Sequence, residues 1–188
     1  MKVATVFGGP RPKGNTVTVL EWVEDELRAK GHEVDRINVV EHKVGGCIGC
    51  FACQRTATET ACIQKDDVPT LLDRLIAADV ILYASPLYCW SWTGQLKAFL
   101  DRHVCLVNNA YSEEWSSLVG DRPVAVLVTA AGPIKDNADL LIKQFDGMAA
   151  YLKAKSKHQF VVPGCTTPDA IPADVKEEAA KFARELIG

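Results

Sequence analysis

The sequence lacks several features that would place it at once in a large class of proteins. Its 188 residues contain no apolar run near the roughly 20 residues that cross a bilayer, and its N-terminus has no long apolar signal core. The net charge is only −3, so charge gives no reason to expect binding to nucleic acid or to anionic membranes. No Gly-Lys-Ser/Thr phosphate loop and no Gly-x-Gly-x-x-Gly fingerprint occur. We therefore expect a cytoplasmic protein without nucleic-acid or membrane partners.

The composition indicates a folded chain of modest size. Hydrophobic residues make up 48% of the sequence and charged residues 24%, which excludes a disordered chain. A chain of this length is near the usual size of one domain and can bury one sizeable core. We expect a single domain over residues 1–188.

Short apolar runs alternate with segments of helical spacing. The runs typical of strands are 3–7, 33–40, 80–84, 124–129 and 159–162, and the helical segments are 16–30, 66–77, 94–103, 137–155 and 173–187. Apolar strands that alternate with helices are typical of a parallel sheet covered on both faces. The pattern predicts an α/β, flavodoxin-like, doubly wound fold with a five-stranded parallel sheet in the order 2-1-3-4-5. Ligands of such folds bind beyond the carboxyl ends of the strands.

The segment after the first expected strand is typical of an anion site. It reads Gly8-Gly9-Pro10-Arg11-Pro12-Lys13-Gly14-Asn15-Thr16. Glycines let backbone N–H groups approach an anion, the Arg and Lys add positive charge, and the start of the following helix adds its dipole. We predict a phosphate here. A plain turn capped by Asn15 or Thr16 is the alternative.

Aromatic residues gather after the third expected strand. Tyr88, Trp90 and Trp92 lie close together in the sequence, outside any apolar period. Beside a phosphate loop they favour a planar ring system that bears a phosphate, such as FMN, although a small satellite core would also explain them. After the fourth strand, the small residues of 129–132 allow close approach to a ligand, and an ordinary turn explains them equally well.

Three segments resemble those of a known family, the flavodoxin-like NAD(P)H-dependent FMN reductases, in the branch that contains the iron–sulfur flavoproteins. They are residues 8–16, the Cys-x2-Cys-x2-Cys loop that begins at Cys47, and residues 85–102. Members of the family often carry Ser where this chain has Gly9. The resemblance implies FMN as cofactor, NAD(P)H as co-substrate, and a homodimer or homotetramer. The expected cofactor-binding residues are Gly9, Arg11, Lys13, Gly14, Asn15, Thr16, Pro86, Leu87, Tyr88, Cys89, Trp90, Thr129, Ala130 and Gly132.

The chain has seven cysteines, and four of them fall in one long irregular segment. They are Cys47, Cys50, Cys53 and Cys62. Three interpretations compete: a [4Fe–4S] cluster, a cluster-free loop of packed thiols or a redox pair near the flavin, and structural zinc. The resemblance implies the cluster. Cys105 and Cys165 are expected to be small buried hydrophobic residues, whereas Cys89 belongs to the expected flavin loop.

These observations favour an enzyme. We expect an FMN-dependent oxidoreductase that takes hydride from NAD(P)H and passes electrons to a quinone-like or other acceptor, with no separate catalytic side chain because the flavin carries the chemistry. The alternative is a non-enzymatic electron-transfer flavoprotein that serves protein partners. Trp90, Trp92 and Trp115 are expected at the surface, compatible with an interface. His103 ends an expected helix, where a cation would be favoured, and Asp101 with Arg102 is expected to be a helix-end charge pair or an interface element rather than catalytic.

Overall fold

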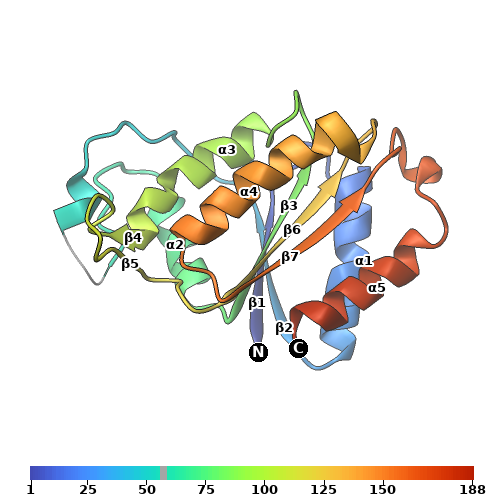
Figure 1. The fold of residues 1–188 in the computed structure, drawn as a ribbon, viewed down its shortest axis with the longest axis horizontal. Coiled ribbons are helices and arrows are strands. Elements are labelled where there is room, and N and C mark those ends of the chain that lie inside the picture. The colour runs from blue at the N-terminus through green and yellow to red at the C-terminus, as the bar shows by residue number, and fades with distance from the viewer. Residues whose placement is uncertain (56–58) are drawn as a thin grey trace.

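The main sheet has the strand order that the sequence predicts. The computed structural model describes residues 1–55 and 59–188. Its parallel strands are β1 (Lys2–Phe7), β2 (Glu33–Asn38), β3 (Val80–Pro86), β6 (Pro123–Thr129) and β7 (Ser156–Val162), in the order β2-β1-β3-β6-β7. Counted along this sheet alone, the order is 2-1-3-4-5 (Figure 1). The flavodoxin-like fold class is confirmed.

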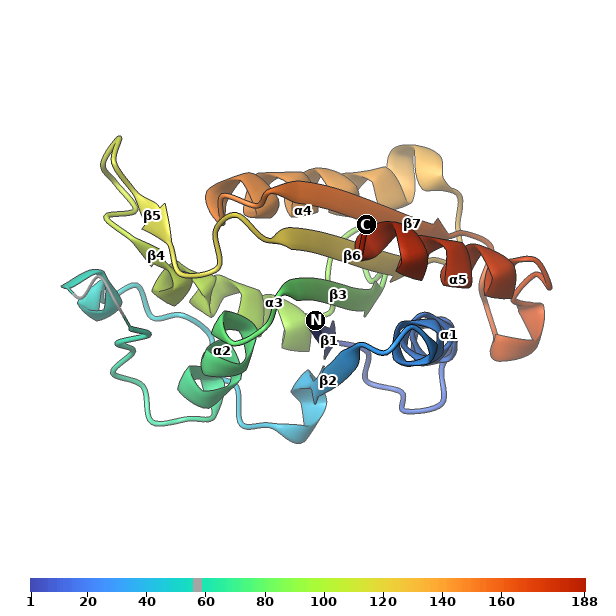
Figure 2. The ribbon, with the colours of Figure 1, turned by 90° about the horizontal axis from the view of Figure 1, so that it is seen from below.

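Helices cover both faces of the sheet. α1 (Asn15–Ala29) and α5 (Val175–Leu186) lie together on one face, and α2 (Val68–Ile76), α3 (Gly94–Asp101) and α4 (Asp139–Tyr151) lie on the other (Figures 1 and 2). Each face has its own buried apolar cluster, so the sheet separates two cores. This explains why its central strands are apolar without alternation.

The sequence pattern did not predict the short elements beyond α3. The helix ends at Asp101 and the chain continues as a 3-10 turn, η3 (Arg102–Leu106). Two short antiparallel strands follow, β4 (Val107–Asn108) and β5 (Ser116–Ser117). Another 3-10 turn, η2 (Ala52–Arg55), lies within the cysteine-rich segment. In the described part of the chain, no helix combines the length and apolarity that crossing a bilayer would require.

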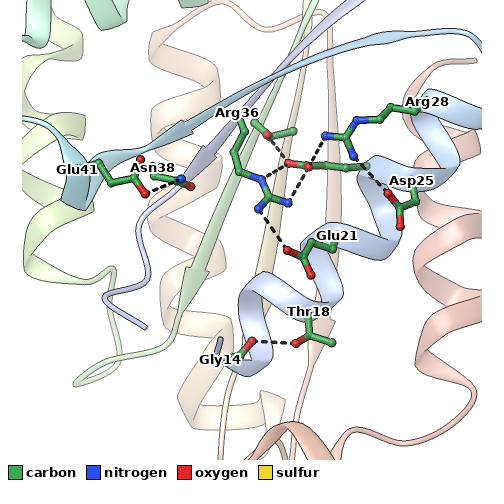
Figure 3. Close-up of polar contacts among 10 residues, drawn as sticks. Gly14, Thr18, Glu21, Asp25, Arg28, Arg36, Asn38 and Glu41 are labelled. Atoms are coloured by element: carbon green, nitrogen blue, oxygen red, sulfur yellow. Dashed lines mark hydrogen bonds and ion pairs between the residues drawn. The ribbon is translucent and has the colours of Figure 1, made fainter. Parts of the chain in front are cut away.

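A buried carboxylate joins α1 to the edge of the sheet. Glu24 of α1 is fully buried and accepts hydrogen bonds from Thr5 Oγ1 at 2.6 Å, Arg28 Nη2 at 2.9 Å and Arg36 Nε at 2.8 Å. Figure 3 shows Arg28 from the helix and Arg36 from β2 reaching this carboxylate from two sides. Because a buried charge needs several partners, these bonds fix the position of α1 and of its N-terminal end against β1 and β2.

His103 is buried in the core, and the expectation of a helix-end cation is wrong. Its Nδ1 lies 3.1 Å from the Phe99 carbonyl oxygen, which can only accept, so Nδ1 donates and Nε2 accepts from the Tyr83 hydroxyl at 2.9 Å. Burial lowers the pKa of His103 to about 4. The imidazole is therefore neutral at physiological pH.

The burial of His103 predicts that the folded protein loses stability at pH values above those at which carboxylates usually titrate. The folded-state pKa of His103 lies below the ordinary value near 6.5, so its contribution to stability is present above that value and is lost as pH falls toward 4. Between pH 7 and pH 5 we expect the free energy of unfolding to fall by about 2 kcal/mol through this residue. Urea unfolding of the wild-type protein and of His103→Gln measures the effect. Equal losses in the two proteins would contradict it.

Candidate functional site

A pocket lies where the parallel strands end, and we call it the strand-end pocket. It has a volume of about 280 Å³. Its lining residues come from the carboxyl ends of the parallel strands, the loops that follow β1, β3, β6 and β7, and the first turn of α1. They are Phe7, Gly9, Pro10, Arg11, Gly14, Asn15, Thr16, Pro86, Leu87, Tyr88, Thr129, Ala131, Cys165 and Thr166.

The structure brings most of the expected cofactor-binding residues to this pocket. Those that line it are Gly9, Arg11, Gly14, Asn15, Thr16, Pro86, Leu87, Tyr88 and Thr129. The expected residues that lie outside its lining are Lys13, Cys89, Trp90, Ala130 and Gly132. Sequence reasoning missed Cys165 and Thr166, which follow β7. The rule that ligands bind at carboxyl ends of strands would have found them if it had been applied to the last strand as well.

Close packing explains the glycines of the first loop. A Cβ atom on Gly8 would lie 2.4 Å from the Cβ of Leu96 in α3, so no side chain fits there. At Gly9 a Cβ would lie 2.5 Å from Cζ of Phe7. The Phe7 ring occupies this space, which accounts for glycine at a position where members of the family often carry Ser.

The start of α1 is left open to an anion. Its N-cap is Gly14, which supplies no side-chain capping bond, and the first turn holds no acidic residue. The alternative of a turn capped by the side chain of Asn15 or Thr16 is therefore wrong. The first backbone N–H groups of a helix have no partner inside the helix, and a negative charge at this end is favoured. Together with Arg11 at the pocket wall, this arrangement suits a phosphate.

The Asn15 side chain is already engaged within the protein. It is buried, and its Nδ2 donates to the Cys165 carbonyl oxygen at 2.9 Å, while Oδ1 has no partner among the described residues. The amide nitrogen is therefore engaged, and it is the backbone N–H of Asn15 that stays available to an anion. The Oγ1 atoms of Thr16 and Thr129 lie 2.7 Å apart, which joins the start of α1 to the end of β6.

The loop after β3 ends in a tight turn at the mouth of the pocket. Tyr88 and Ser91 exchange two backbone hydrogen bonds of 3.0 Å across a β-bridge. The two residues between them, Cys89 and Trp90, have φ values of 46° and 60°. Positive φ at both central residues is the pattern of a type I′ turn, where Asn-Gly is preferred. Trp90 is exposed, whereas Trp92 is buried, so the expectation of a surface position is wrong for Trp92.

A second, smaller cavity lies in the cysteine-rich segment, and we call it the cysteine cavity. Its volume is about 30 Å³, room for about one water molecule. It is lined by Cys47, Ile48, Gly49, Cys50, Phe51, Cys53, Cys62, Ile63, Gln64, Arg102, Val104 and Cys105. All four expected metal ligands are present, together with a fifth cysteine. Among the described residues, however, no three His, Cys, Asp or Glu side chains are placed to hold a metal ion.

A buried guanidinium lies in the wall of the cysteine cavity. Arg102 is fully buried and pairs with Asp66, through Nη1 to Oδ2 at 2.8 Å and Nη2 to Oδ1 at 3.1 Å. It also donates to the Gly45 carbonyl at 2.9 Å and to Cys62 Sγ at 3.1 Å. Burial favours the neutral Asp66 carboxyl, but the hydrogen bonds from Arg102 and Gly45 prevail and lower the pKa of Asp66. Of the two alternatives for Asp101 and Arg102, the charge pair is wrong, since Asp101 instead pairs with Lys97.

Comparisons with known proteins point to one family. The family model described as NADPH-dependent FMN reductase matches residues 1–162. An Archaeoglobus fulgidus protein named iron-sulfur flavoprotein is 33% identical over 102 residues, which cover 54% of this chain and 45% of that protein. A Cupriavidus pinatubonensis protein named FMN-dependent NADH:quinone oxidoreductase 2 is 32% identical over 105 residues, with 54% and 48% covered. The chain thus spans about half the length of these two relatives.

Solved structures share the fold over nearly the whole chain. The azoreductase AzrA superposes with a TM-score of 0.78 at 17% identity, covering 98% of this chain and 100% of that one. An azoreductase from Bacillus anthracis gives a TM-score of 0.77 at 18% identity, covering 98% and 99%. At such identities the likeness establishes the architecture.

The turn at Cys89 and Trp90 predicts a gain in stability on substitution. A non-glycine residue at positive φ carries a cost that glycine avoids, of about 1 kcal/mol per residue. Trp90→Gly should therefore raise the free energy of unfolding by about 1 kcal/mol, with Ser91→Gly as a control in which glycine brings no such relief. Denaturant unfolding measures both. A loss of stability in Trp90→Gly equal to that in Ser91→Gly would contradict the assignment of strain to the turn.

Proposed function

Since the chain belongs to the NADPH-dependent FMN reductase family, we propose that it is an oxidoreductase that binds FMN in the strand-end pocket. It takes hydride from NAD(P)H and passes electrons to a quinone-like or other acceptor, as one flavin-binding domain over residues 1–188. The pocket carries this proposal, because it joins an open helix start to the loops after β3 and β6.

The residues of the strand-end pocket fit the phosphate of FMN. The first N–H groups of α1 lack a side-chain cap, Arg11 stands at the wall, and the glycine at position 9 leaves backbone accessible in the lining. A dianionic group would satisfy these donors without burying a carboxylate of the protein. Lys13 is exposed and lies outside the lining, so it contributes charge at longer range.

The rest of the pocket suits a flat ring. Pro86, Leu87 and Tyr88 form one wall, and Thr129 with Ala131 forms another. The Leu87 N–H donates to the Thr129 carbonyl at 2.8 Å, which holds the two walls together. When bound, FMN supplies the hydride chemistry. The protein orients the ring, and the walls exclude water from one side of it.

Exposed apolar side chains support assembly with further copies of the chain. Tyr88 is 40% exposed, Trp90 58%, and Ile134 45%. Aromatic residues are enriched at interfaces. We propose a homodimer or homotetramer, whose mass sedimentation velocity would measure.

Flavin affinity tests the placement of the phosphate. We expect the purified protein to bind FMN. Addition of NADPH or NADH should bleach the bound flavin, and addition of a quinone should then give turnover. Arg11→Ala should weaken FMN binding about tenfold or more through loss of a charged hydrogen bond, and leave riboflavin, which has no phosphate, unchanged. Lys13→Ala is the matched control, a nearby cation outside the lining, and should change FMN binding little.

Three outcomes would contradict parts of this proposal. Equal loss of FMN and riboflavin binding in Arg11→Ala would place the phosphate elsewhere. Bound flavin that neither nicotinamide reduces would favour the electron-transfer flavoprotein instead of the enzyme. Failure to bind either flavin would remove the basis of the proposal.

We also propose that Cys47, Cys50, Cys53 and Cys62 hold a [4Fe–4S] cluster. The close spacing of the first three supports this, as does the cavity that all four line. As the described residues stand, the cavity has room for about one water molecule and no metal-holding group forms, so the proposal requires the cysteines to move when a cluster binds. No electron-transfer step is therefore routed through it.

Chemical analysis tests the cluster directly. Protein purified without oxygen should contain iron and sulfide at about four each per chain. Cys50→Ser should lower both, while Cys165→Ser, which alters a cysteine of the strand-end pocket, should lower neither. Iron-free protein that retains its FMN would contradict the cluster and leave the flavin assignment intact.

A further inference from the structure

Two threonine hydroxyls from distant parts of the sequence meet at the wall of the strand-end pocket. Thr16 is the second residue of α1, and Thr129 is the last residue of β6. The two residues are 4% and 3% exposed, and both line the pocket. Their Oγ1 atoms lie 2.7 Å apart, which is the usual distance of a hydrogen bond between two hydroxyls.

This pair of hydroxyls has one hydrogen that the pair itself does not use. Each hydroxyl carries one hydrogen, and only one of the two hydrogens can lie between the oxygens. Among the described residues, neither Oγ1 atom has a second hydrogen-bond partner. The other hydrogen therefore lacks an acceptor among these residues. Because a buried donor without a partner is costly, a ligand that brings an acceptor to this wall is favoured.

The position of Thr16 indicates which of the two hydroxyls meets the ligand. Thr16 lies in the first turn of α1, where backbone N–H groups without a side-chain cap favour an anion. A fully ionised phosphate has no hydrogen to give, so a hydroxyl beside it must donate. When Thr16 donates to the anion, its oxygen is left to accept the hydrogen of Thr129. Each bond in such a chain polarises and strengthens the next.

The backbone of Thr129 is bonded to another part of the pocket. Its carbonyl accepts from the Leu87 N–H at 2.8 Å, and Leu87 belongs to a wall that suits the flat ring. Thr129 thus uses its backbone on the side of the ring and its side chain on the side of the phosphate. Valine at this position would keep the backbone bond and nearly the same shape, and would remove only the hydroxyl.

We propose that Thr129 is a positioning residue for the phosphate of the ligand and acts through Thr16. Thr129 donates to Thr16, and Thr16 donates to a phosphate oxygen. We call this order of two bonds the hydroxyl relay. The inference rests on the proposed binding of FMN in the strand-end pocket, and it adds a residue that distinguishes a flavin with a phosphate from one without, although it does not touch the phosphate itself.

Flavin binding to the full chain tests the hydroxyl relay. Thr16→Val should weaken FMN binding about tenfold, because a hydrogen bond to a charged group is lost, and Thr129→Val about threefold, because only its support is lost. Neither should change the binding of riboflavin, which has no phosphate. Thr129→Ser keeps the hydroxyl and should bind FMN as the wild-type protein does. Thr70→Val is the matched control, since it removes an exposed hydroxyl on α2, outside the lining.

The double variant Thr16→Val/Thr129→Val distinguishes a relay from two direct contacts. In a relay the Thr129 hydroxyl has no effect once that of Thr16 is gone, so the double variant should bind FMN about as tightly as Thr16→Val. Losses that add would mean that Thr129 contacts the ligand directly, and would overturn the proposal. Equal weakening of FMN and riboflavin binding in Thr129→Val would also overturn it, because that result indicates a general structural role. Thr129→Ala gives the same comparisons where valine impairs folding.

Inorganic phosphate separates the failure of this inference from the failure of the proposed function. Phosphate should raise the melting temperature of the wild-type protein, and raise it less in Thr129→Val, whether or not a flavin binds. Wild-type protein that binds no FMN would contradict the proposed function, and the response to phosphate would still test the relay. Wild-type protein that binds FMN, with a Thr129→Val variant that binds FMN and phosphate equally well, would contradict the relay alone. Binding of neither FMN nor phosphate would contradict both.

Discussion

The close contact between α3 and the backbone of Gly8 positions both candidate sites. A Cβ at Gly8 would lie 2.4 Å from the Cβ of Leu96, so only glycine lets the helix approach this far. Thr93, the N-cap of α3, donates to the Gly8 carbonyl at 2.6 Å and accepts from the Leu96 N–H. The loop beside the strand-end pocket and the start of α3 are therefore one hydrogen-bonded unit. The helix then runs about 12 Å along its axis and ends where Arg102 enters the cysteine cavity.

The fold and most of the strand-end pocket could be predicted from the sequence, because the sequence patterns that indicate them are local. Apolar runs between helical segments predict parallel strands, and parallel strands bring their carboxyl ends to one edge. The glycines and Arg11 follow a strand directly, so their place at that edge could be predicted. The roles within the pocket could not. The side-chain amide nitrogen of Asn15 donates to the backbone carbonyl of Cys165, which lies far along the chain, and no local sequence pattern predicts such a bond.

The cysteine cavity shows where sequence reasoning ends. Spacing found four of its cysteines, but Cys105 and Arg102 belong to a 3-10 turn that continues from α3. A residue after a helix is expected in solvent, and an arginine beside an aspartate is expected to pair with it. Here the chain folds back, Arg102 is drawn to Asp66, and the thiol of Cys105 is buried among others. Tertiary packing overrode both local expectations.

The strand-end pocket and the cysteine cavity also differ in whether their positive groups already have a partner. The strand-end pocket leaves helix N–H groups without a side-chain cap, so it gains by receiving an anion. In the cysteine cavity the one buried cation among the lining residues, Arg102, is already matched by the Asp66 carboxylate. Within the described part of the chain, the Nε atom of Arg102 is buried and has no hydrogen-bond partner. Four cysteine thiolates would therefore have little positive charge nearby to balance them, whereas neutral thiols need no such balance. Without a metal to balance them, the cysteines of this cavity are held most readily as neutral thiols.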